Sequence, residues 1–326
     1  MARAWPRLNA PRGRSPGTRL GLIGALLLAG FSLLAVAAPV VAPYDPHAQV
    51  APPFAPPSRH HLLGANDVGQ DLFSELIYGS RISLVIGTLV ALASGVLGAG
   101  VALASGYLGG TVDIALMRVT DLLLALPFLP LLMVLAVFLG PGVLLETLVI
   151  GAVSWARPAR ELRSQVLSVR ERDYVRAVQA MGANAWRITI RHVLPGVAPL
   201  IIPQFVRTAQ AAILLEASLS FLGLGDPVAK SWGSTLFYAN ARGAFLTDAW
   251  LWWVLPTGLC ISGVVIGFAF VGYALEERLS PGLRDVRGPE AVPRRLRERT
   301  PAPAEAALRT APLLQRSSAP VEADDA

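Results

Sequence analysis

The stretch ISLVIGTLVALASGVLGAGVALASG, residues 82–106, carries no charged side chain from end to end. An α-helix rises about 1.5 Å per residue, so about 20 such residues cross the ~30 Å hydrocarbon core of a bilayer. The stretch is therefore predicted to be a transmembrane helix. Small residues recur along it: Gly87, Ala91, Gly95, Gly98, Ala102 and Gly106. Such residues let helix backbones approach closely in lipid, which favours a helix-packing face over the alternative of a substrate path.

Five further apolar segments complete the pattern. They run over residues 20–42, 114–139, 143–160, 197–222 and 249–275. Hydrophobic residues make up 53% of the 326-residue chain and charged residues 15%, whereas a soluble domain carries about 25% charged residues. The chain is therefore predicted to be an all-α integral membrane protein with six transmembrane helices, and the membrane domain is expected to occupy residues 20–285.

The first and fourth segments each allow more than one interpretation. The first follows an arginine-rich arm, residues 1–19, as a signal peptide would, but it is longer than the usual apolar region of ~7–15 residues. We expect an uncleaved span. The fourth is short because its apolar run meets Arg157 and Arg160. Arginine stems reach from a helix to the headgroups, so it is still predicted to span. In the third segment, Pro127 and Pro130 are expected to produce kinks.

The chain is basic, with 28 Lys and Arg against 22 Asp and Glu, and Lys230 is its only lysine. The arginines cluster between apolar runs, which is the pattern of cytoplasmic loops and not of a nucleic-acid surface. Both termini and the connection 161–196 are therefore predicted to be cytoplasmic. The connections 43–81 and 223–248 are expected on the other side. Residues 286–326 are rich in proline, alanine and charge and are predicted to be a disordered cytoplasmic tail.

Catalytic and cofactor motifs are absent from the sequence. A phosphate-binding loop needs a glycine–lysine pair, and Lys230 follows Ala229. If ATP drives this protein, another chain must bind it. The single cysteine, Cys260, excludes an internal disulfide and a multi-cysteine metal site. His60 and His61 are expected to be solvated loop residues, with a metal-ligand role as the alternative. No catalytic residue, cofactor or metal is predicted.

Three charged residues lie inside the predicted spans: Asp121, Arg207 and Glu216. Charges in lipid are costly and usually face the protein interior or water. Asp121 lies three residues from Arg118 and is expected to form a local ion pair. Arg207 and Glu216 need partners on another helix, a water-filled path or an interface. All three are candidates for a gate or translocation path, and Glu216 is expected to tie its helix to a neighbour near the outer end.

The connection between the fourth and fifth spans contains ERDYVRAVQAMGANAWRITIRHVLP, residues 171–195. Its apolar residues at helical spacing are Tyr174, Val175, Val178 and Met181. They predict a short amphipathic helix. Gly182 is expected to end that helix, Asn184 to cap the next one from Ala185, and Pro195 to mark a break before the fifth span. The apolar stripe fits a partner's groove, and packing against the protein's own membrane core is the alternative.

The spacing from Arg176-Ala177-Val178 through Gly182 to Leu194-Pro195 resembles the coupling loop of bacterial ABC importer permeases. Further similarity lies in HHLLGANDVGQDLFSELIYGSRISL (60–84), EASLSFLGLG (216–225), Trp232-Gly233 and Pro281–Arg284. Together these motifs resemble the C-type subunit of the dipeptide, oligopeptide and nickel permeases.

The resemblance implies a type I ABC importer permease fold in the bacterial inner membrane, with no covalent chemistry of its own. It also implies three kinds of protein partner: a homologous second permease subunit, two ABC ATPase subunits and an extracytoplasmic substrate-binding protein. With the apolar stripe, it places the ATPase-coupling contacts on Tyr174, Arg176, Ala177, Val178, Met181, Gly182, Leu194 and Pro195.

The chain departs from the family pattern at several positions. Arg176 stands where the coupling motif usually has glutamate, Val178 where it has alanine, and Ala65, Asn66 and Gln70 replace threonine, aspartate and arginine. The change at Arg176 puts a specific ionic contact with the ATPase in doubt, but not the docking helix itself, and the other changes are interpreted as a shift of substrate or receptor. The expected substrate is a dipeptide or oligopeptide, with nickel or another small solute as the alternative. A proton-driven secondary transporter is the alternative from another class.

Overall fold

The computed structural model describes residues 16–279, and this part of the chain is helical without a β-sheet. Two isolated bridges, Gln49 to Gln70 and Ala65 to Asp71, are the extended pairings in the connection between the first two long helices. The all-α class predicted from the apolar segments is confirmed. The first fifteen residues and the predicted tail lie outside the described residues, whereas residues 16–19 of the predicted arm already belong to the first helix.

Four helical stretches are long and apolar enough to cross a membrane: Gly17–Val36, Leu72–Leu108, Ala185–Phe221 and Asp248–Leu279. The first corresponds to α1 (Pro16–Val36), which the short α2 (Ala38–Val41) follows. The second is α3 (Leu72–Leu103), extended by the π-helical turn η1 (Ala104–Leu108). The last ends in α12 (Val254–Leu279), after the 3₁₀ turns η3 (Ala244–Leu246) and η4 (Asp248–Leu251).

The third predicted span is broken near its middle. It consists of α4 (Gly110–Ala125) and α5 (Phe128–Leu139), which meet at an angle of 94°. Leu126 is extended, as expected for a residue before proline, and Pro127 directly precedes the first residue of α5. The kink predicted at Pro127 is thus present. The one predicted at Pro130 is wrong, because Pro130 lies in the first turn of α5, where no intrahelical N–H bond is lost.

The fourth predicted span corresponds to α6 (Val143–Ser154) and the start of α7 (Ala156–Arg170). Only Trp155 separates the two helices, and its backbone is itself helical. Alone, α6 is about 18 Å long and falls short of a bilayer. Together, α6 and α7 are long enough to cross the bilayer. In that arrangement Arg157 and Arg160 lie near the boundary between hydrocarbon and headgroups. The described helices give four spans, or five with the bent pair, and the count of six stays a prediction.

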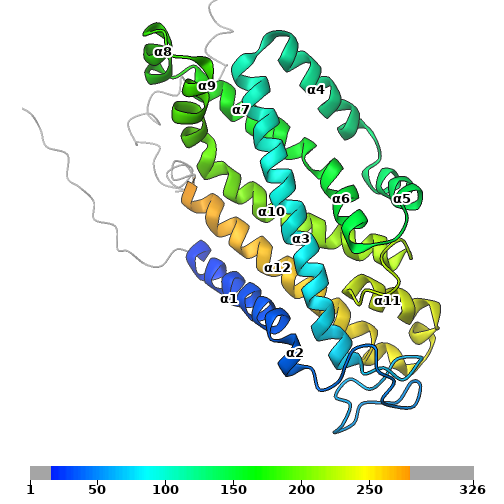
Figure 1. Ribbon diagram of the computed structural model, residues 1–326. Helices are drawn as coiled ribbons and strands as arrows, with labels where there is room; N and C mark the ends of the chain where they lie inside the picture. Colours follow the sequence, from blue (N-terminus) through cyan, green and yellow to red (C-terminus); the bar gives the residue numbers. More distant parts are fainter. Residues whose placement is uncertain (1–15, 280–326) are drawn as a thin grey trace, which may run out of the picture. The chain divides into compact units, whose positions relative to one another are not determined.

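Helix α3 contacts more of the molecule than a peripheral helix would, because it packs against α1, α6, α7, α10 and α11. Its glycines make this possible. A Cβ on Gly98 would lie 3.0 Å from Pro158 of α7, one on Gly106 in the η1 extension would lie 2.6 Å from Val166, and one on Gly87 would overlap Ile213 of α10. The helix-packing role of these three small residues is confirmed, whereas Gly95 faces open space. Helix α1 also lies along α12 (Figure 1).

The fifth span is one continuous helical stretch. It begins with α9 (Ala185–Ile188), widens into the π-helical η2 (Thr189–Val193) and continues as α10 (Leu194–Phe221). The break predicted at Pro195 is therefore wrong. A proline ring crowds the carbonyl four residues earlier, and the wide π turn just before Pro195 leaves room for it. Pro199 and Pro203 follow within α10, so three prolines recur at four-residue intervals.

Candidate functional site

One end of the bundle carries the small helix α8 (Asp173–Ala180) and α9, joined by a tight turn. Gly182 has φ +79°, the left-handed conformation that glycine adopts without strain. Its N–H donates to the carbonyl of Gln179 at 3.0 Å. The side chain of Asn184 accepts from the N–H of Trp186 at 3.1 Å and caps α9. The helix end at Gly182, the cap at Asn184 and the new helix from Ala185 are confirmed.

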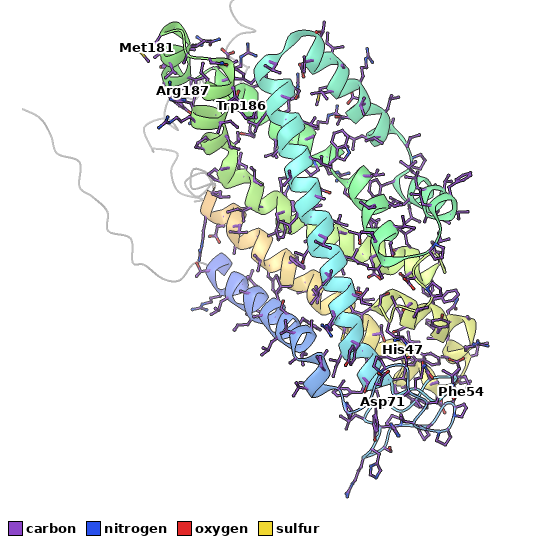
Figure 2. The ribbon with its side chains drawn as sticks, in the orientation of Figure 1. His47, Phe54, Asp71, Met181, Trp186 and Arg187 are labelled. Atoms are coloured by element: carbon purple, nitrogen blue, oxygen red, sulfur yellow. The ribbon has the colours of Figure 1, made fainter. Side chains whose placement is uncertain are left out.

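The predicted apolar stripe of this helix divides between two environments. Val175 is fully buried, and the half-buried Val178 packs on the same core cluster, which includes Val166, Ile188 and Val193. These side chains pack on the protein's own core, so the outward orientation favoured for them is wrong. Met181, at 76%, and Trp186, at 73%, are the most exposed apolar residues of this segment, ahead of Tyr174 and Ile190. Figure 2 shows Met181 and Trp186 near Arg187, at the end of the bundle opposite His47, Phe54 and Asp71.

We call Met181 and Trp186, with the turn between them, the apolar tip. Trp186 was missed from the sequence because it stands outside the stripe of the preceding helix. The other predicted coupling residues surround the tip or lie at the base of the segment. Tyr174, Arg176 and Ala177 are exposed, and Arg176 pairs with Glu171. Leu194 packs against the core cluster, and Pro195 is exposed in the first turn of α10.

A cavity of about 520 Å³ lies between α4, α5, α6, α7 and α10. Much of its wall is apolar and is formed by Leu123, Leu124, Leu126, Phe128, Leu214 and Leu215. The polar part of the wall consists of Arg157, Glu161, Gln204 and Arg207. The cavity therefore offers both signs of charge beside an apolar surface. We call it the interhelix cavity.

Arg207 takes its partners from two other helices. Its Nε donates to Glu276 of α12 at 2.9 Å, and its guanidinium lies 3.7 Å from Glu161 of α7. Asp121 does not form the expected local pair with Arg118, because Arg160 of α7 lies 3.5 Å from its carboxylate. Helix α7 thus supplies partners to both. Exposed ion pairs contribute under about 1 kcal/mol each to stability, so these pairs orient charges more than they hold the fold.

Glu216 is separate from the interhelix cavity, whose wall does not include it. It is fully buried, and Ser83 of α3 donates to its Oε2 at 2.8 Å. The predicted tie between this helix and a neighbour is therefore present. A second buried acid, Glu146 in the first turn of α6, lies close by and was not singled out from the sequence. The three charges grouped as a gate or path thus occupy three different environments.

At the end opposite the apolar tip, polar residues fix the connection 42–71 to the helices. His61 lies 3.0 Å from Asp71, which also accepts from the N–H of Ser74 and caps α3. His61 is thus not the solvated residue expected, although His60 is exposed. Lys230 donates to the buried Glu75 at 2.6 Å, just before α11 (Trp232–Ala241). Within residues 16–279, His, Cys, Asp and Glu side chains nowhere gather in a set of three that could hold a metal ion.

These features define the class, which is a multi-pass helical membrane protein with a partly charged cavity between its helices. Residues 94–285, more than half of the chain, match the family described as binding-protein-dependent transport system inner membrane component. The chain belongs to this family of ABC transport permeases, which confirms the resemblance noted from its motifs.

Relatives are similar over most of their length. The chain is 33% identical over 284 residues to the dipeptide transport system permease protein DppC of Bacillus subtilis, covering 86% of this chain and 85% of the relative. It is 34% identical over 268 residues to the "Probable D,D-dipeptide transport system permease protein DdpC" of Escherichia coli K12, covering 81% and 88%. It is 38% identical over 265 residues to a Brucella suis protein provisionally named as a peptide transport permease, covering 80% and 88%.

Proposed function

We propose that this chain is the permease subunit of an ATP-driven importer of dipeptides or oligopeptides in the bacterial inner membrane. The carrying observation is the apolar tip, which exposes Met181 and Trp186 at the start of the continuous helical stretch Ala185–Phe221. Two large apolar side chains that are each about three-quarters exposed suit a partner's groove. An ATPase subunit docked there would act directly on a membrane-spanning helix.

The partners follow from this assignment. A homologous permease subunit completes the membrane unit, two ATPase subunits supply the energy, and a substrate-binding protein delivers the solute. The apolar tip and both termini then lie in the cytoplasm, in agreement with the arginines of residues 161–196. The names of the relatives support peptides over nickel as the substrate. The permease itself performs no covalent chemistry and changes between conformations.

The assignment is tested by uptake into proteoliposomes that contain this chain, its permease and ATPase partners and the substrate-binding protein. We expect peptide to accumulate only when ATP is present in the vesicle lumen, on the side of the membrane where the ATPase subunits lie. The purified chain alone should neither bind nor hydrolyse ATP, because it has no glycine–lysine phosphate loop. Uptake driven by a proton gradient without ATP would instead identify a secondary transporter.

We propose that the interhelix cavity is the part of the translocation path that this chain contributes. Its mixed wall suits a zwitterionic peptide, whose ammonium and carboxylate ends would meet Glu161 and Arg207 while apolar side chains meet the leucines. Arg207 is half-exposed, so its loss should cost little stability. A charged contact to substrate is worth about 1.4 kcal/mol or more, which corresponds to a tenfold change in rate or affinity.

We therefore expect Arg207→Gln to lower peptide uptake about tenfold with unchanged insertion and ATPase activity. Concentration-dependent uptake into the same proteoliposomes measures this effect. The matched control is Arg118→Gln, because Arg118 is exposed on α4 and does not line the cavity. Equal losses in both variants would contradict a specific role for Arg207.

A further inference from the structure

Two buried carboxyl groups face one hydroxyl group where α6 meets α10. The Oγ of Ser220 lies 3.3 Å from Oε1 of Glu146 and 3.2 Å from Oε1 of Glu216. Glu146 is 5% exposed and Glu216 is fully buried. Ser220 lies one helical turn beyond Glu216 on α10, and Glu146 belongs to the first turn of α6. The hydroxyl therefore links two acids from two helices.

The number of protons available for hydrogen bonding restricts the charge that Glu146, Ser220 and Glu216 can carry together. A serine hydroxyl has one proton to donate and can accept through its oxygen. If both acids were ionised, Ser220 could donate to only one of them, and the other carboxylate would face an oxygen lone pair. Two negative charges would then also be buried together, which strongly favours protonation of one. With one acid protonated, every link has a donor and an acceptor.

The second oxygen of Glu216 indicates which acid keeps its charge. Ser83 of α3 donates to Oε2 of Glu216 at 2.8 Å, so at least two hydroxyls serve this carboxylate. Ser220 is the hydrogen-bonding partner found for the Glu146 side chain among residues 16–279. Hydrogen bonds to a carboxylate stabilise its ionised form. The proton thus belongs on Glu146, which donates to Ser220, which in turn donates to Glu216.

The neighbouring elements bring no positive charge to the pair. Neither acid takes part in an ion pair within the part of the chain that the structure describes. Helices α5 and α11 carry no charged residue, and α3 carries Glu75 and the exposed Arg81. Lys230 is bound to Glu75. Asp226, after α10, adds further negative potential at Glu146. A proton is the cation that the group can hold without rearrangement.

We propose that Glu146, Ser220 and Glu216 form a proton-binding site that holds a single proton and joins α6 to α10 and, through Ser83, to α3. While the proton is bound, α6 and α10 stay in contact. Loss of the proton would leave two buried negative charges facing one hydroxyl and would drive α6 away from α10. The proposal goes beyond the transport function, and its test needs no transport, so its failure would leave that function untouched.

Infrared spectroscopy of the purified chain tests the proposal directly. Exposed carboxyl groups are ionised at neutral pH, so a protonated-acid carbonyl band there reports a buried acid. We expect this band in the wild-type chain and its loss in Glu146→Gln, while the exposed Glu171→Gln retains it. The absence of the band from the wild type at neutral pH, or its persistence in Glu146→Gln, would overturn the proposal.

Thermal unfolding at several pH values provides an independent measurement. The folded chain holds a proton that the unfolded chain releases at neutral pH, so stability must fall as pH rises. One proton corresponds to a melting temperature that falls by about 3 °C per pH unit between mildly acidic and neutral buffer, the range in which the unfolded chain has released the proton and the folded chain still holds it. Glu146→Gln keeps a neutral hydrogen-bond donor and should remove this dependence. An identical slope in the variant and the wild type would contradict the shared proton.

Discussion

Replacing Met181 and Trp186 together by glutamate is expected to abolish ATP-driven uptake while the chain still inserts and folds. Both side chains are largely exposed, so their loss removes no core packing. An aromatic anchor at a protein interface typically contributes 2 kcal/mol or more, equivalent to about 30-fold weaker binding. Binding of the solubilised ATPase subunits to the permease pair, measured by titration, should weaken at least about 30-fold, with uptake lost in parallel.

The control for this variant keeps the apolar character of the tip. Met181→Leu with Trp186→Phe retains two large apolar side chains and should preserve most of the binding. Ala177, which is exposed on the same small helix, provides a second test, since a bulky charged residue there should weaken docking as well. Normal ATPase binding by the double glutamate variant would show that the partner contacts another part of the molecule.

Lys230→Met is expected to destabilise the folded chain by about 3–5 kcal/mol. The change leaves the Glu75 carboxyl group buried without its cation, and breaking one side of a buried ion pair typically costs this much. Glu75 is 2% exposed, and the Lys230 side chain is 14% exposed. Chemical denaturation in detergent, followed by tryptophan fluorescence, measures the loss. Gln70 and Asn66 also bind within this group, so the effect reaches the whole end of α3.

Two further variants test whether the unpaired Glu75 carboxyl group causes the loss of stability. Adding Glu75→Gln to Lys230→Met removes the unpaired carboxyl group and should restore most of the stability. Arg160→Met breaks a pair with Asp121 in which both side chains are more than half exposed, and it should cost less than about 1 kcal/mol. If the double variant is as unstable as Lys230→Met alone, lost packing and not the unpaired carboxyl group explains the defect.

Sequence patterns predicted the long apolar helices well because a membrane span depends on a property of consecutive residues. The break at Pro127 and the turn at Gly182 were also predictable, since each follows from the backbone geometry of one residue. The error at Pro195 has a different origin. A proline interrupts a regular α-helix, but the preceding π turn accommodates it, and no local pattern announced that turn.

The side-chain environment of the candidate site depended on contacts between distant segments. Periodicity placed Val175 and Met181 on one stripe, yet only the packing of α7 and η2 decides that the first is buried and the second exposed. Glu146 and Glu216 are 70 positions apart in the sequence, and a single acid near the start of a helix gave no signal of a partner. Such pairings require the fold.

The three prolines of α10 have a mechanical consequence. Each lacks an N–H group, so the hydrogen bonds to the carbonyls four residues earlier are missing at three successive turns. Pro195, Pro199 and Pro203 are four residues apart and lie on one side of the helix, which is weakened along that side only. A force that a partner exerts at Trp186 should therefore bend this helical stretch about a single axis. The segment that carries Glu216, anchored to α3, would stay in place while the end near Trp186 swings.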